Sequence, residues 1–507
     1  MTAIQGLTGI QPTQILSDPE TGDPVWHASI SRGLQDILTK MVRYHFSQRY
    51  QSAEEVLQVL DHLSELPLAS TMIPNSSVAW PDSLLNPSIG DETLVDSPVV
   101  DTPVARKELR RRLNVKAIAL TALSVTGLLA GLRQVGGLQA AELAVYDQWV
   151  RLEAQRKPVS VDPRLLLVEI READLQALQR GTPSDADVAQ VIRNLRKYQP
   201  RVIGLDLHRD LPQEPGHREL MQELQSADVV TIMKLGNDQQ TFDIPPPQGV
   251  PDNRLGFNDF PIDPDRAVRR NLLYATVNNQ PFTSFALRLA THYLKTEPQA
   301  SSTQAGVMQL NQTDFPPITP TVGGYQTIDA AGYQILLNYR SPQAPAPQLS
   351  FTSVLQDKLD PAWVKDKVVL IGTTAISGKD FFRTPFQSGS TGDYLMPGVV
   401  VHAQMVSQIL SAVSGQTSLL KAWPDWAELL WIGGWALVGA SLVWTVWHPL
   451  RLAAAGIMVI ILLVGSTYLM FVGSVWLPCV TPMIALLLSA AGVIVWHSYK
   501  VTTSAES

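Results

Sequence analysis

Six polar side chains mark a candidate binding cleft. They are Glu169, Glu172, Asp206, Asp380, Thr384 and His402. Three of them, Glu169, Asp206 and Asp380, fall at or just after the ends of apolar runs that are typical of strands. Ligands of open α/β sheets bind outside the carboxyl ends of the strands, so carboxylates there are suited to hold a ligand. The alternative stays open that Asp206 and Asp380 cap helices or stabilise loops, and that His402 begins a helix as an ordinary polar residue.

The sequence does not match the motifs for phosphate binding, metal binding or serine hydrolysis. The segment GTTAISGKD (372–380) resembles a phosphate-binding loop, but five residues separate its glycines instead of four, and Asp380 replaces the required serine or threonine. His208, His217 and His292 lack the spacing of metal ligands, and no GxSxG is present. We therefore expect no metal, no cofactor and no catalytic residue, with an external hydrolase as the alternative.

The elements that must position the candidate residues alternate along the chain. Apolar, β-branched runs of the length expected for strands buried on both faces are LLLVEI (165–170), VIGLDL (202–207), VVTIMKL (229–235) and KVVLIGTT (367–374). Helical patterns occupy 184–199, 217–227, 282–294 and 402–413, and Ser184 is the predicted N-cap of the first. This alternation predicts an α/β fold with a mainly parallel sheet and flanking helices, and with loops or an antiparallel excursion between 236 and 281.

Four further segments are apolar enough to cross a membrane. The first, 113–133, contains the uncharged run 117–132, and the second covers 429–447. The 48 residues from 452 to 499 contain no Asp, Glu, Lys or Arg, and Gly473, Pro478 and Pro482 divide them into two more spans at about 452–472 and 479–497. Eight of the twelve tryptophans fall between 423 and 496, several near span ends, where such rings favour the membrane interface.

The charges that flank these spans predict their orientation. The stretch RKELRRR (106–112) precedes the first span and holds five basic residues against one acidic residue, so the positive-inside rule places the N-terminus in the cytoplasm. Four crossings return the C-terminus to the cytoplasm and leave 134–426 outside it, in the periplasm of a bacterium. The net charge of -7 and the absence of a basic stretch with interleaved aromatics argue against a nucleic-acid partner.

The external segment and its four spans resemble a known family. The stretches AELAVYDQWVRL (141–152), DPRLLLVEIREADL, VVLIGTTAISGKDFFRTPF and MPGVVVHAQMVSQIL occur in an order similar to that of the second type of CHASE domain, a sensory extracellular domain associated with cyclases and histidine kinases. The resemblance covers about 113–499. It implies a sensor module that receives an unidentified extracytoplasmic ligand and passes a signal to a cytoplasmic kinase or other signalling partner, with a homodimer as a further candidate.

The N-terminal segment has a different resemblance. GLTGIQPTQ, DPVW and LQDILTKMVRYHFSQRYQSAEEVLQVL are similar to the end of a bacterial Ser/Thr protein kinase domain, and Arg49 matches an arginine that closes its helical lobe. The motifs that catalyse phosphoryl transfer are missing, so we expect no kinase activity from this chain as given. The alternative is a membrane Ser/Thr kinase whose start lies upstream of Met1.

These patterns predict the following division: a short α-helical kinase remnant (1–64), a flexible linker with a basic juxtamembrane stretch (65–112), a first transmembrane helix (113–133), the external domain (134–426), three transmembrane helices (427–499) and a cytoplasmic tail (500–507). The predicted location is the bacterial cytoplasmic (inner) membrane, with the lipid bilayer as a partner and both termini cytoplasmic.

Overall fold

The computed structural model describes residues 103–156, 161–237, 240–387, 395–446 and 448–505, together with a few positions between 36 and 59. The chain divides into two units, Met1–Pro98 and Val99–Ser507. Most of the predicted kinase remnant (1–64) and most of the predicted linker (65–112) lie outside the described residues, so the fold below is that of the second unit.

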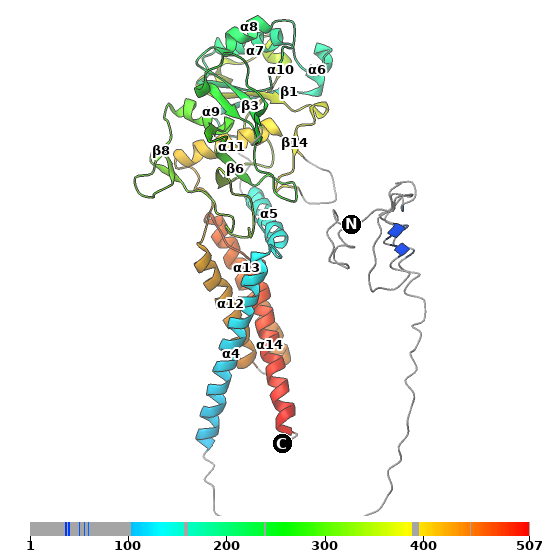
Figure 1. Ribbon diagram of the computed structural model, residues 1–507, viewed down its shortest axis with the longest axis vertical. Coiled ribbons are helices and arrows are strands. Elements are labelled where there is room, and N and C mark those ends of the chain that lie inside the picture. Colours follow the sequence, from blue (N-terminus) through cyan, green and yellow to red (C-terminus); the bar gives the residue numbers. More distant parts are fainter. Residues whose placement is uncertain are drawn as a thin grey trace, which may run out of the picture. The chain divides into compact units, whose positions relative to one another are not determined.

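A mainly parallel sheet forms the centre of the domain (Figure 1). In the described part of the chain this sheet has seven strands, six of them in the order β12 (Gln348–Ser350), β1 (Leu165–Ile170), β13 (Val368–Thr373), β2 (Val202–Asp206), β3 (Val229–Asn237) and β4 (Gln240–Ile244), while β5 (Leu255–Phe257) also pairs with β3. Only the β3–β4 pair is antiparallel among these described strands. The predicted α/β fold with a mainly parallel sheet is thereby confirmed.

Helices cover both faces of this sheet, and the sequence of β1 shows why. Its six residues, LLLVEI, are all buried. Because successive side chains of a strand point to opposite faces, Leu165 and Leu167 join one apolar cluster, while Leu166 and Val168 join the other. Helices α9 (Phe285–Leu294) and α11 (Gly398–Val413) contribute to the first cluster, and α7 (Asp185–Arg196), α8 (His217–Leu224) and α10 (Phe351–Leu355) contribute to the second.

Two helix starts differ in how well their sequences predict them. Ser184 caps α7 as predicted, because its side chain accepts a hydrogen bond from the backbone of Asp187, whose carboxylate bonds back to Ser184. Helix α11 begins four residues before the predicted start at 402, since Gly398–Val401 are already helical and buried. The short helix α6 (Glu172–Leu178) follows β1 directly.

The region between β5 and β13 contains smaller antiparallel sheets. One has the order β11 (Tyr333–Leu336), β6 (Arg270–Val277) and β7 (Gln280–Thr283), and another has the order β10 (Thr313–Phe315), β9 (Met308–Leu310) and β8 (Gln299–Ala300). After β13 there are two short pairs: an antiparallel one of β14 (Phe381–Phe382) with β15 (Met396–Pro397), and a parallel one of β16 (Lys421–Ala422) with β17 (Val475–Trp476). The second pair lies where the domain meets the long apolar helices.

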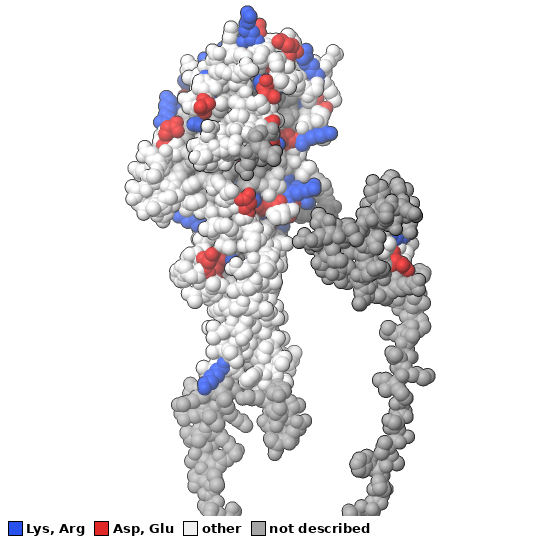
Figure 2. Space-filling view, viewed as in Figure 1, with Lys and Arg blue, Asp and Glu red and all other residues white. Residues whose placement is uncertain are grey.

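Among the described residues, four helical segments are long and apolar enough to span a membrane: Val115–Gln134, Asp425–Thr445, Pro449–Val472 and Val480–Ser498. They belong to α4 (Pro103–Gln134), α12 (Asp425–Thr445), α13 (Pro449–Val472) and α14 (Val480–Ala505), which run together away from the sheet domain (Figure 1). Figure 2 shows most charged atoms on the domain and near the end of the bundle that adjoins it, while the described surface of the bundle is otherwise mostly white, apart from a blue group at its other end. Helix α5 (Gln139–Arg156) connects α4 to the domain.

Candidate functional site

A cavity of about 310 Å³ opens beside the carboxyl ends of β2, β3 and β5 and the beginning of α11. Parallel strands that end at one edge of a sheet bring residues from distant parts of the sequence together there. The lining residues are Asp206, His208, Lys234, Ile244, Asn258, Asp259, Phe260, Ile262, Asp380, Phe382, Gly398 and His402.

Two carboxyl groups of the lining interact with each other. Asp206, the last residue of β2, is buried, and burial together with the charge of Asp380 raises its pKa to about 8, although a hydrogen bond with Asn258 acts in the opposite direction. The pKa of Asp380 is also raised by burial, which a hydrogen bond from the Gly398 backbone partly offsets. At neutral pH the pair therefore holds a proton on Asp206, because a buried pair of neighbouring carboxyls resists double ionisation.

His402 faces the cavity as an uncharged ring. It is 3% exposed, and burial lowers its pKa to about 4 against the effect of a hydrogen bond with the Asn258 backbone. The rings of Phe260 and Phe285 contact it edge-on, each with its centroid 5.3 Å away, so the imidazole is held in place. Its Nδ1 is buried and has no hydrogen-bond partner among the described residues.

Three further polar side chains, Asp259, His208 and Lys234, line the cavity. Asp259 accepts a hydrogen bond from the Leu235 backbone at 2.9 Å, and burial raises its pKa. His208 is half-buried and its pKa is lowered by burial. Lys234 supplies a positive charge, and its ammonium lies 3.8 Å from the carboxylate of Asp243, with nearly half of its side chain exposed.

A close contact fixes the start of α11 against the acidic pair. A Cβ atom built on Gly398 would lie 2.2 Å from Oδ2 of Asp380, which leaves room for glycine alone at this position. The backbone nitrogen of Gly398 also donates to the carbonyl of Asp380 at 3.0 Å. The segment that carries Asp380 is thereby tied to the helix that carries His402.

The structure brings together three of the six residues predicted from the sequence, namely Asp206, Asp380 and His402. Glu169 instead forms an ion pair with Arg171 and accepts a hydrogen bond from Gln348. Glu172 accepts a hydrogen bond from the Ser377 hydroxyl at 2.9 Å. Thr384 is buried outside the cavity lining.

Sequence reasoning missed most of the lining. His208 follows Asp206 by two residues and could have been found from its place after the strand. Asn258, Asp259 and Phe260 come from a stretch without periodic pattern, so only the fold brings them to the sheet edge. No group of three or more His, Cys, Asp or Glu side chains suited to a metal ion occurs among the described residues.

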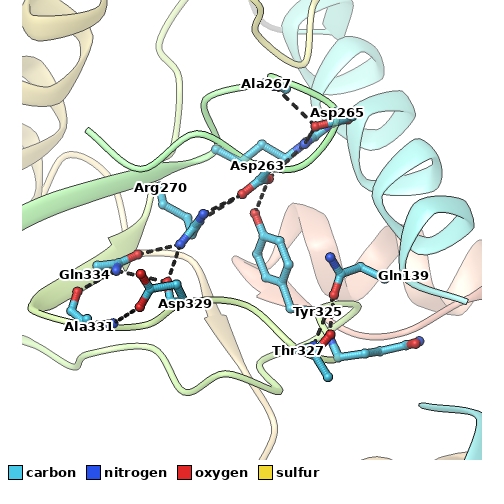
Figure 3. Close-up of polar contacts among 12 residues, drawn as sticks. Gln139, Asp263, Asp265, Ala267, Arg270, Tyr325, Thr327, Asp329, Ala331 and Gln334 are labelled. Atoms are coloured by element: carbon cyan, nitrogen blue, oxygen red, sulfur yellow. Dashed lines mark hydrogen bonds and ion pairs between the residues drawn. The ribbon is translucent and has the colours of Figure 1, made fainter. Parts of the chain in front are cut away.

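The loop that supplies Phe260 and Ile262 continues into a buried polar network. Asp263 accepts a hydrogen bond from Tyr325 at 2.6 Å and bonds to Arg270 at 2.9 Å, as Figure 3 shows. Arg270 also bonds to the side chain of Gln334 and to the backbone of Asp329 (Figure 3). The loop beside the cavity is therefore connected directly to the part of the domain around Tyr325.

Arg269 attaches the same loop to helix α5. It is 1% exposed, and its guanidinium makes two hydrogen bonds of 2.7 Å to Asp147 on α5. It also pairs with Asp263 at 2.8 Å and with Asp265 at 2.6 Å. Its pKa is raised above the ordinary value because hydrogen bonds to Asp147 and Asp265 outweigh the effect of burial.

Tyr325 connects this network to the long apolar helices through its contact with Trp476. Its ring packs edge-on against Trp476, with centroids 5.3 Å apart, and Trp476 also contacts Tyr146 of α5. Trp476 belongs to β17, between α13 and α14. A second link joins Arg133, at the end of the first span, to the buried carboxylate of Glu428 on α12 at 2.6 Å.

Comparison with known proteins finds one family and two relatives. The family model described as "CHASE2 domain" matches residues 124–441, more than half of the chain. Serine/threonine-protein kinase PknA of Nostoc sp. is 35% identical over 63 residues, which are 12% of this chain and 11% of the kinase. Serine/threonine-protein kinase C of Synechocystis sp. is 34% identical over 83 residues, 16% of each chain. The chain thus spans a small part of these relatives, and no solved structure matches it.

Proposed function

The chain belongs to the CHASE2 domain family, a family of sensory domains, and we propose that it is a multi-pass membrane receptor that binds its ligand outside the cytoplasm. In this proposal the α/β domain lies in the periplasm, anchored in the bacterial inner membrane with both chain ends in the cytoplasm. The basic stretch 106–112 before the first span supports this orientation.

One observation carries the proposal: the continuous set of contacts from the cavity to the membrane helices. The loop with Ile262 lines the cavity, the next residue is Asp263, and Asp263 is bonded to Tyr325, which packs on Trp476 before α14. A ligand shifts a conformational equilibrium only by its different affinities for two states. A ligand that changes the position of this loop therefore has a packed route by which to bias the arrangement of the spans.

The partner that receives the signal is, in this proposal, a kinase on the cytoplasmic side. The two relatives named above, both Ser/Thr protein kinases, support this choice of partner. They also support a second candidate function, in which this sequence is the sensor part of a longer transmembrane Ser/Thr kinase. Reading the nucleotides upstream of Met1 separates the two, because an open frame with kinase motifs favours the second and stop codons exclude it.

The orientation is tested with single cysteines and a membrane-impermeant maleimide. Ser302 lies on an exposed turn of the α/β domain, and the native Cys479 is buried, so it gives a low background. We expect Ser302→Cys to be labelled on intact spheroplasts and Thr502→Cys to be labelled only after lysis. The reverse pattern would place the domain in the cytoplasm and end the proposal.

A further inference from the structure

Three buried carboxylates elsewhere in the domain have arginine partners. Asp162 pairs with Arg164 and Arg340, and Asp185 pairs with Arg209. Asp263 pairs with both Arg269 and Arg270. These fixed cations offset the cost of removing a carboxylate from water. At these three positions the fold itself neutralises the buried acid.

The carboxyl groups of the cavity differ from these because they have no such ion-pair partner among the described residues. In the described part of the chain, neither Asp206, Asp259 nor Asp380 forms an ion pair with a lysine or arginine. Lys234 lines the same cavity, pairs with Asp243 and acts to lower the pKa of Asp259, whereas no lysine or arginine among the described residues forms an ion pair with Asp206 or Asp380. The cavity therefore contains a buried acidic pair without an ion-pair partner among the described residues, so a proton or a bound cation is suited to neutralise its charge.

His402 adds an unused hydrogen-bonding atom to the same wall. Its side chain is 3% exposed, and its Nδ1 has no partner in the part of the chain that the structure describes. A buried polar atom without a partner costs free energy, and a ligand that supplies a hydrogen bond would remove that cost. Because burial keeps the ring uncharged, it does not repel a cation.

The aromatic lining favours an organic cation over a metal ion. Phe260 and Phe382 line the cavity with ring centroids 4.6 Å apart, and Ile244 and Ile262 add apolar surface. Ring faces attract ammonium groups and also contact the carbon atoms that such ligands carry. A metal ion requires three or more grouped ligand atoms, and no such group is found among the described residues.

From these contacts we infer that the cavity binds a small organic ammonium ion, with the charged nitrogen between Asp206 and Asp380 and the carbon chain against Phe260 and Phe382. This inference rests on the proposed sensor function and assigns its ligand class. The cavity volume of about 310 Å³ is at the lower end of ligand pockets, which suits a ligand of only a few heavy atoms.

Binding of the ammonium ion should release a proton. The groups that face the acidic pair are His208 beyond β2, Lys234 on β3, Asp259 beyond β5 and His402 on α11. Of the pair itself, Asp206 carries a proton at neutral pH, because its pKa lies near 8. The ligand must displace this proton, so its affinity should rise by up to about tenfold per pH unit from pH 6 to 8 and level off above that.

The test uses the full chain in lipid nanodiscs and measures probe affinity by calorimetry and by the shift of the unfolding midpoint. The probes are ethanolamine and 1,4-diaminobutane. Ethylene glycol and 1,4-butanediol are their neutral matches, and glycolate and succinate are their anionic matches. We expect only the two ammonium probes to bind and to raise the midpoint, with affinity that rises towards pH 8.

Variants assign the binding to the acidic pair. Asp206→Asn copies the shape of the protonated residue, so it should fold while weakening ammonium binding at least tenfold and removing its pH dependence. Asp380→Asn should weaken binding similarly. Asp366→Asn removes one negative charge from an exposed turn and should leave binding unchanged.

Three results would overturn the inference: binding of the anionic probes instead, equal binding of the diols, or no response to either ammonium probe. None of them bears on the sensor proposal, because the cysteine labelling of Ser302→Cys and Thr502→Cys is independent of any ligand. The reverse labelling pattern would contradict the proposed sensor function, but it would not change the measured affinities for the ammonium probes.

Discussion

Glu142 holds the beginning of helix α14, since its Oε1 lies 2.7 Å from both the backbone nitrogen and the Oγ1 of Thr481. Its Oε2 accepts hydrogen bonds from the backbone nitrogens of Cys479 and Val480 at 2.8 and 3.1 Å. A carboxylate at a helix N-terminus satisfies free N–H groups and interacts favourably with the helix dipole. Glu142 comes from α5, so one buried side chain joins the domain to the last span.

Replacing this carboxylate with an amide should destabilise the junction. Glu142→Gln retains one acceptor but turns an NH₂ group towards two backbone N–H groups, so two buried hydrogen bonds to a charged group are lost. We expect a loss of about 3 kcal/mol in unfolding free energy, measured by thermal unfolding in nanodiscs. Glu219→Gln, at an exposed position in α8, is the control and should change stability by less than about 0.5 kcal/mol.

Arg269 should be irreplaceable even by lysine. It forms two-bond contacts with both Asp147 and Asp265 and a single bond with Asp263, a geometry that one ammonium group does not reproduce. Arg269→Met, which leaves the largely buried Asp147 without its ion-pair partner, should cost about 3–5 kcal/mol. Arg269→Lys should fall between this value and the wild type, and the exposed Arg218→Met should have little effect. Equal unfolding midpoints for the wild type and Arg269→Lys would contradict this role.

Alanine substitutions at two glycines allow the stability effect of the Trp476 contact to be measured separately from the effect of backbone strain. Gly323 and Gly306 both have positive φ, +60° and +75°. A Cβ on Gly323 would lie 2.5 Å from the Trp476 ring, whereas a Cβ on Gly306 would meet nothing within 4 Å. Both alanine variants should lose about 1 kcal/mol from backbone strain. Gly323→Ala should lose about 1–3 kcal/mol more because the indole must move.

Chemical denaturation of the two variants, measured side by side, gives this difference directly. If both lose the same stability, the ring of Trp476 is free to move away, and the packed route from Tyr325 to α14 is not rigid.

The central strands could be predicted because their apolar runs identify them without knowledge of the fold. β1, β2, β3 and β13 all begin within one residue of their predicted starts, and Ser184 caps α7 through a local contact. Asp206 and Asp380 could be paired in advance because parallel strands end at a common edge. In these cases the determining interactions are local or follow from strand direction.

The rest of the site depends on pairings between distant segments that leave no local pattern. Glu169 was a reasonable candidate by position, but the three-residue strand β12 brings Gln348 to its carboxylate, and Arg171 pairs with it as well. Asn258 and Phe260 reach the cavity because β5 pairs with β3 across an irregular stretch. Nothing in the sequence around these residues indicates that they face Asp380.

The acidic pair and His402 should give the protein opposite dependences of stability on pH. Asp206 has a folded-state pKa near 8, above its ordinary value of 3.8, so its stabilising effect is complete below about pH 4 and is lost as the pH rises through 8. His402 has a folded-state pKa near 4, below its ordinary 6.5, so its effect is complete above about pH 6.5 and is lost as the pH falls through 4.

Two variants isolate these contributions in thermal unfolding from pH 4 to 9. Relative to Asp206→Asn, the wild type should lose about 1.4 kcal/mol per pH unit between pH 5 and 7, because only the unfolded chain releases the proton in this range. Relative to His402→Gln, the wild type should instead lose stability as the pH falls from 6 to 4.5. Curves that run parallel for the wild type and Asp206→Asn would mean that Asp206 is ionised in the folded protein, and the cavity would then carry its negative charge without a bound proton.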